Sequence, residues 1–199
     1  YDNALSHLNK SIQLKPGYLP PVKSKLHLLK VMKKKQDILK FLNDMIVQFP
    51  DDAFFYSEKA LVLSDLGKET EAINSYKSAY LIEPDYPFVL GKIVFDKLLN
   101  GEWDKIQNDC EEILSKTENE KEVADPLTVS YIFDSPPLLR KSAEIFVNFK
   151  NFGLNKKVEL SNLKKKEKIN IGYYSADFRN HPVGHLISRL IELHDKSKF

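Results

Sequence analysis

Two histidines near the carboxyl end of the sequence, His181 and His185, flank Pro182 and stand four residues apart. Proline is favoured at the first position of an α-helix, so we expect His181, or Asn180 just before it, to occupy the helix N-cap. The helix macrodipole disfavours imidazolium at that end, which leaves a neutral ring able to accept a proton from an attacking hydroxyl group. His181 is therefore the candidate catalytic residue. The alternative for a lone histidine before proline is a capping or turn residue.

The spacing of His181 and His185 also suits a shared metal ion, because residues four apart lie on one face of a helix. However, no Glu stands between them as in a HExxH motif, and no Cys or third His is nearby. We therefore expect no metal site. Asp177, Asn180 and His185 are instead candidate substrate-binding residues. The alternative for Asp177 and Asn180 is that their side chains only shape the loop.

A strand and a helix are expected to position these residues. Over 169–174 the side chains alternate in a period of two that is typical of a β-strand, with Ile169, Ile171 and Tyr173 on one face and Asn170, Gly172 and Tyr174 on the other. From Pro182 the apolar residues recur at helical spacing, at Val183, Leu186, Ile187, Leu190 and Ile191. Residues 175–181 then form a strand-to-helix turn, where α/β proteins bind ligands and helix amides favour an anion.

The stretch SADFRNHPVGHL, residues 175–186, follows the predicted strand IGY. It resembles the opening of the catalytic region in the O-GlcNAc transferase and SPINDLY family of glycosyltransferases, with Asp, Phe, Asn, His, Pro and a second His in fixed order. The resemblance implies tetratricopeptide repeats followed by a two-lobed, GT-B type catalytic domain that needs no metal and no cofactor. The matching histidine of the family lies in the active-site cleft as base or positioning group, which implies a site at His181.

The same resemblance implies what the protein does. We expect an enzyme that transfers N-acetylglucosamine from UDP-GlcNAc to Ser or Thr of an acceptor protein or peptide. Residues 169–199 would be only the start of the amino-terminal lobe, and in the family the second lobe holds the nucleotide sugar, so this fragment should be inactive alone. Two alternatives stay open: a repeat scaffold for protein interactions with a vestigial catalytic lobe, and a related O-fucosyltransferase that uses GDP-fucose.

An internal repeat precedes this motif. Pro16, Pro50 and Pro84 follow one another at intervals of 34 residues, the tetratricopeptide period. The best copy, residues 53–86, predicts helices over 53–66 and 69–82. Its small, aromatic and turn residues stand where this repeat requires them, at Tyr56, Ala60, Gly67, Ala72, Tyr76, Ala79 and Pro84. We expect these residues to pack the helical solenoid and to contact no ligand.

Less regular copies lie on both sides of this one. Residues 19–52 keep the phase, residues 1–16 supply the second helix of a truncated repeat, and a degenerate unit after Pro87 ends near 118. The sixth position of each repeat is occupied by Ser24, Glu58 and Lys92, where well-studied family members often place the asparagines that grip a peptide backbone. Residues 1–118 therefore predict a repeat array that departs from the family's asparagine pattern, although its groove can still bind a partner.

Residues 119–155 are expected to form a helical bridge. Before the bridge, a helix is predicted from Trp103 to about 116. Within the bridge, Asp125-Pro126 starts a predicted helix that ends near 132, and Ser135-Pro136-Pro137 starts another that ends near 149. This order resembles the bridge between repeats and catalytic lobe in bacterial members of the family. Residues 156–168 are rich in lysine, and two glutamates interrupt the run, which favours a solvated linker over an anion-binding patch.

Composition excludes several classes of protein. The net charge of +2 provides no overall attraction to nucleic acid, and no apolar run reaches the roughly 18 residues that a membrane span needs. The single cysteine, Cys110, fits a reducing compartment. We therefore expect a mainly α, cytoplasmic protein that binds neither nucleic acid nor membranes. The family resemblance implies its partners, a protein or peptide acceptor and a nucleotide-sugar donor that the missing lobe would hold.

Overall fold

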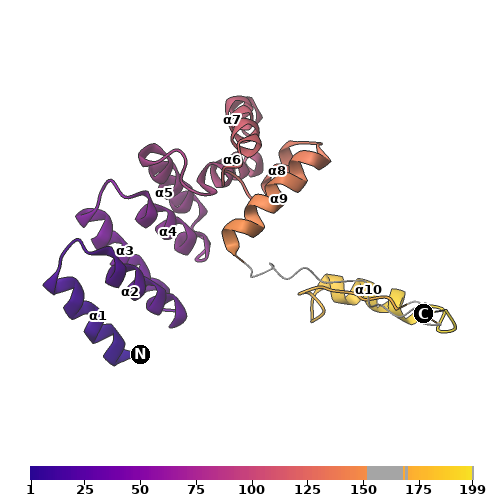
Figure 1. Ribbon diagram of the computed structural model, residues 1–199, viewed down its shortest axis with the longest axis horizontal. Coiled ribbons are helices and arrows are strands. Elements are labelled where there is room, and N and C mark those ends of the chain that lie inside the picture. Colours follow the sequence, from indigo (N-terminus) through magenta and orange to yellow (C-terminus); the bar gives the residue numbers. More distant parts are fainter. Residues whose placement is uncertain (152–167, 169, 199) are drawn as a thin grey trace. The chain divides into compact units, whose positions relative to one another are not determined.

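The computed structural model describes residues 1–151, 168 and 170–198, and the chain forms two compact units, Tyr1–Phe152 and Gly153–Phe199. The described residues are mainly α-helical and contain no strand (Figure 1). The first unit contains the predicted repeats and the described part of the predicted bridge. The predicted linker, 156–168, lies outside the described residues apart from Lys168.

The first unit begins with pairs of helices that recur at the interval of the sequence repeat. Each helix packs against the next along the chain, a pattern typical of repeat proteins, in which every unit contacts only its neighbours. The first residues of α2 and α4 are 34 positions apart, as are those of α3 and α5. The helices are α1 (Asp2–Leu14), α2 (Leu19–Val31), α3 (Lys35–Gln48), α4 (Ala53–Ser64) and α5 (Glu69–Ile82).

Small side chains and turn residues explain why these segments pair. Ala60, Ala72 and Ala79 are almost completely buried, and their size lets the backbones of α4 and α5 approach closely. Gly67 ends the first helix of this pair with a φ of +72°. Lys33 occupies the equivalent position one repeat earlier with a φ of +56°. The predicted helix pairs are therefore confirmed.

Five further elements complete the first unit. They are α6 (Val89–Leu99), the short 3₁₀-helix η1 (Trp103–Lys105), α7 (Gln107–Glu118), α8 (Pro126–Ile132) and α9 (Pro136–Lys150). The two helices predicted from Asp-Pro and Ser-Pro signals are confirmed, since Asp125 and Ser135 accept hydrogen bonds from Thr128 and Leu138 amides as N-caps. The α-helix expected to begin at Trp103 begins instead at Gln107, after the 3₁₀ turn.

The segment 122–124 fastens α8 and α9 to the repeats. The first amides of α6 have no acceptor within their own helix, and here Phe88 N–H donates to the Glu122 carbonyl at 2.5 Å and Gly91 N–H to the Val123 carbonyl at 3.0 Å. Val123 and Ala124 are buried in one apolar cluster with residues of α6, α7, α8 and α9. Repeats and bridge thus share a core.

Gly91 is required at this contact. A Cβ atom added there would lie 2.7 Å from both Cα and Cβ of Ala124 and 3.2 Å from the Val123 carbonyl oxygen. Only a residue without a side chain lets the segment 122–124 lie this close to α6.

The second unit corrects one prediction. The strand expected over 169–174 is absent from described residues 170–174. A strand is held by hydrogen bonds to a neighbouring strand, and the described residues supply none. The predicted helix is confirmed as α10 (Pro182–Glu192), and the Tyr173 hydroxyl lies 2.5 Å from His194 Nε2 beyond its end. None of the described helices has both the length and the apolar character that crossing a bilayer requires.

Replacing Gly91 by Ala tests the docking of segment 122–124. In an unobstructed helix this change stabilises by up to about 1 kcal/mol because Ala has the higher helix propensity. Here the new methyl group meets Ala124, so we expect the free energy of unfolding in urea to fall by about 1–3 kcal/mol. Ser115→Ala, on the exposed face of α7, is the control. A more stable Gly91→Ala protein would contradict the packing described.

Candidate functional site

His181 occupies the N-cap of α10, as the sequence predicts. Its backbone is extended, with φ −151° and ψ 148°, and Pro182 follows at the first helical position. The ring nitrogen Nδ1 accepts a hydrogen bond from the Val183 N–H at 3.3 Å. The imidazole therefore replaces the Ser, Thr, Asp or Asn side chain that more often caps a helix.

This hydrogen bond determines which chemistry His181 can perform. An Nδ1 atom that accepts a hydrogen bond carries no proton, so the neutral ring carries its proton on Nε2. The Nε2 edge of the ring is then a hydrogen-bond donor. Acting as a general base through Nε2, as the sequence suggested, requires the other tautomer and loss of the cap. In the capped state His181 can stabilise a nearby oxygen that carries or develops negative charge.

The structure brings two of the other predicted residues together. His185 Nε2 lies 3.0 Å from Asn180 Oδ1, and because an amide oxygen only accepts, the histidine donates. Both side chains are exposed. The pair joins the turn to the first turn of α10 and leaves the Asn180 amide group available to a ligand.

Asp177 shapes the turn through its backbone as well as its carboxylate. Its N–H donates to Ser175 Oγ at 3.0 Å, and its Oδ1 lies 3.6 Å from Arg179 Nη2. These are interactions within the loop, as expected for a residue that fixes loop conformation. Asp177 has no contact with His181 among the described interactions, so the structure does not join all four predicted residues into one cluster.

Gly184 is a structural requirement of this turn that the sequence analysis missed. A Cβ atom there would lie 2.6 Å from the Arg179 carbonyl oxygen and 3.1 Å from that of Asp177. The loop 177–179 can therefore lie against the first turn of α10 only because residue 184 has no side chain. A glycine one turn after the cap, inside a helical pattern, is the sequence signal that indicates such close approach.

The surroundings of these residues are open. No described residue of α10 is buried, and several apolar side chains on it are exposed, including Leu186 at 79% and Leu190 at 50%. Among the described residues, no three His, Cys, Asp or Glu side chains gather where they could hold a metal ion.

The sixth-position residues of the repeats differ in their environment. Ser24 is exposed, Glu58 forms an ion pair with Lys30, and Lys92 Nζ lies 2.8 Å from Asp125 Oδ2. Burial opposes ionisation of Asp125, but hydrogen bonds from Lys92 and Thr128 outweigh it and lower its pKa. Lys92 thereby links α6 to the N-cap of α8.

Comparison with models of known protein families found no match for the chain, and comparison with curated proteins found none either. The family resemblance of residues 175–186 therefore stays a prediction from the motif.

Asp125→Asn tests the ion pair between Lys92 and Asp125 through the dependence of protein stability on pH. Asn keeps the capping ability but loses the charge, so we expect the unfolding free energy at pH 7 to fall by about 1 kcal/mol. The Asp125 carboxylate stabilises the fold above its unfolded pKa of about 3.9 and ceases to do so as the pH falls through its lower folded value. The difference between wild type and variant should therefore shrink below about pH 4. Exposed Asp134→Asn is the control; equal pH profiles for wild type and Asp125→Asn would contradict the ion pair.

Proposed function

We propose that this chain belongs to a protein O-glycosyltransferase that transfers N-acetylglucosamine from UDP-GlcNAc to Ser or Thr. The supporting observation is the turn before α10, where His181 caps the helix through Nδ1 and the neutral ring therefore carries its proton on Nε2. This geometry occurs within the motif that resembles the first active-site segment of the O-GlcNAc transferase and SPINDLY family.

The proposed reaction is a displacement at the anomeric carbon of the sugar. The acceptor hydroxyl oxygen forms a bond to that carbon, the bond from the carbon to the diphosphate oxygen breaks, and a base takes the hydroxyl proton. Negative charge develops on the diphosphate. In our proposal His181 donates Nε2–H to an oxygen of the reacting groups, at the positive end of the α10 dipole. The base is then another group, and no metal or cofactor takes part.

The extended residues 170–174 have a place in the same proposal. Ile171 and Tyr174 are exposed, at 43% and 95%, and a period-two strand gains its hydrogen bonds only from neighbouring strands. In a complete GT-B lobe, other segments would supply those strands and cover the apolar face of α10.

Two alternatives remain within the proposal. A repeat scaffold for protein interactions is favoured by a pocket in the first unit that residues of the repeats and the bridge line. A GDP-fucose donor is the second alternative, because SPINDLY-like enzymes share the motif.

The test uses the full-length protein with UDP-GlcNAc, GDP-fucose and a peptide mixture, and mass spectrometry measures sugar transfer. His181→Asn keeps a capping side chain but removes the imidazole donor, so we expect transfer to fall by about 100-fold or more with α10 intact by circular dichroism. The 199-residue chain alone should show no turnover.

His7 is exposed on α1, so His7→Asn is the matched control and should retain wild-type transfer. Undiminished transfer by His181→Asn would contradict the role given to the imidazole. No transfer by the wild-type protein from either donor would contradict the proposed activity and favour the scaffold.

A further inference from the structure

A pocket of about 700 Å³ lies in the first unit between the repeat helices and α9. Its walls come from α4, α5, the turn before α6, α6 itself, the beginning of α8 and the last turns of α9, and six of the lining residues are aromatic. The aromatic residues are Tyr76, Tyr86, Phe88, Phe95, Phe146 and Phe149. A pocket of this volume with such walls is typical of a ligand site.

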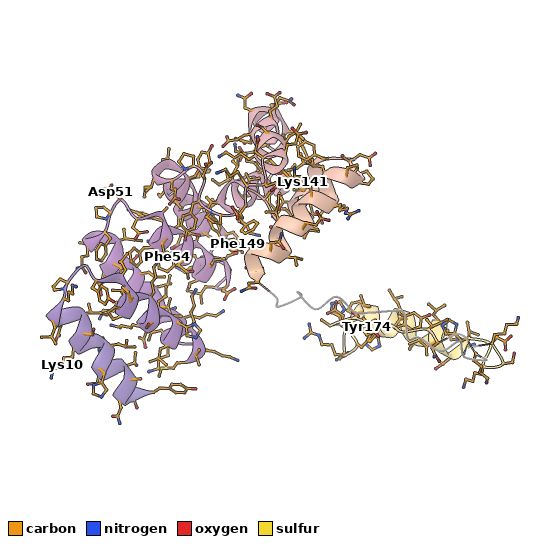
Figure 2. The ribbon with its side chains drawn as sticks, in the orientation of Figure 1. Lys10, Asp51, Phe54, Lys141, Phe149 and Tyr174 are labelled. Atoms are coloured by element: carbon orange, nitrogen blue, oxygen red, sulfur yellow. The ribbon has the colours of Figure 1, made fainter. Side chains whose placement is uncertain are left out.

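Packing between the rings holds the α9 side of the pocket in place. Phe88 contacts Phe146 and Phe149 edge to face, with ring centroids 5.5 and 5.0 Å apart. Phe149, labelled in Figure 2, belongs to the last turn of α9 and is still 46% exposed, because one side of the ring borders the pocket. The aromatic wall is therefore preformed, and an apolar ligand group would bury it further.

Two hydroxyl groups of residues that line this pocket have no partner in the described protein, and neither oxygen is fully enclosed. Ser57 and Tyr76 are only 8% and 7% exposed, and no hydrogen bond joins either hydroxyl to a described residue. Two other hydroxyls of α5 are paired, since Ser75 donates to the Glu71 carbonyl and Tyr80 to the Glu112 carboxylate. A ligand carbonyl placed here could accept a hydrogen bond from the Ser57 or Tyr76 hydroxyl.

The side of the pocket that Tyr76 and Tyr86 form, called here the tyrosine side, carries an excess of negative charge. Burial, followed by the carboxylates of Glu58, Glu69 and Asp65, raises the pKa of Tyr76 to about 12. Burial and the carboxylates of Glu58, Asp52 and Glu83 raise the pKa of Tyr86. This side therefore favours a cationic group of a ligand over an anionic one.

The lysines near the pocket are already engaged. Lys30 pairs with Glu58, Lys92 pairs with Asp125, and Lys150 lies over the rings of Phe146 and Phe149 at 5.4 and 5.9 Å. Each of these lysines therefore already has a partner within the protein.

We propose that this pocket binds a peptide segment of a partner protein through one large apolar side chain next to a Lys or Arg. The apolar side chain enters between the aromatic walls, the cation lies towards Glu58, and peptide carbonyls accept hydrogen bonds from Tyr76 and Ser57. An apolar anchor in an aromatic pocket, surrounded by polar contacts to the backbone, is a common basis of peptide recognition. The proposal does not depend on glycosyltransferase activity.

The test uses fluorescently labelled synthetic peptides of about ten residues and the whole chain. The central residue is Leu, Phe, Ser or Asp, and both of its neighbours are Lys, Ser or Glu; fluorescence anisotropy gives the dissociation constants. Peptides with a central Leu or Phe and flanking Lys should bind most tightly, about 10-fold or more above those with central Ser or flanking Glu.

Two variants locate the binding to the pocket. Tyr76→Phe removes only the hydroxyl and should weaken binding by about 3- to 10-fold; Tyr18→Phe, in the turn before α2, is its control. Leu61 borders the pocket but is 45% exposed, so Leu61→Lys should leave the fold intact, repel the flanking Lys and weaken binding by about 10-fold or more. Leu81→Lys, at 83% exposure on α5, is its control.

Several results would overturn the proposal. They are the absence of any peptide with a dissociation constant below about 1 mM, a preference for flanking Glu, or equal binding by Leu61→Lys and Leu81→Lys. Binding of the apolar dye 8-anilinonaphthalene-1-sulfonate without peptide binding would assign the pocket to a small molecule instead. Self-association that Leu61→Lys abolishes in sedimentation would assign it to a second copy of the chain.

Discussion

The first unit depends on the contact between the segment 122–124 and the beginning of α6. Two helix amides without intrahelical acceptors, those of Phe88 and Gly91, donate to the carbonyls of Glu122 and Val123. The contact satisfies backbone groups of both partners and buries Val123 and Ala124 in the cluster that joins α6 to α9. Phe88 serves twice, because its ring also packs on Phe146 and Phe149. One junction therefore connects the repeats to the bridge and forms the aromatic pocket.

The second unit depends on local interactions instead. His181 bonds to the amide two residues on, Asn180 bonds to His185 in the next turn, and Gly184 admits the loop carbonyls. Such short-range contacts form without a large core, and they fix the protonated nitrogen of His181 before any substrate arrives. The proposed role as a donor follows from this capping geometry, whereas the nature of the substrate rests on the family resemblance of the motif.

The elements that the sequence predicted best are those with local signals. Asp125-Pro126 and Ser135-Pro136 marked two helix starts, and alanines at 60, 72 and 79 marked buried contacts. The strand over 169–174 was wrong for the described residues because strand formation depends on distant partners that a period-two pattern does not specify. Tyr76 was predicted to pack within the solenoid, and it does so in the cluster of α4 and α5. That it also lines a pocket could not be predicted locally, because residues of α9 form the other wall.

Hydrogen exchange at the Phe88 and Gly91 amides measures this junction most directly. Both amides belong to the cap and first turn of α6, where helical hydrogen bonds give no protection. If the segment 122–124 docks as described, NMR should show both exchanging as slowly as the buried core amides of α6 and α7, for example those of Val94 and Ile113. Exchange of Phe88 and Gly91 at the rate of an unstructured peptide, with Val94 still protected, would contradict the docking and with it the preformed pocket.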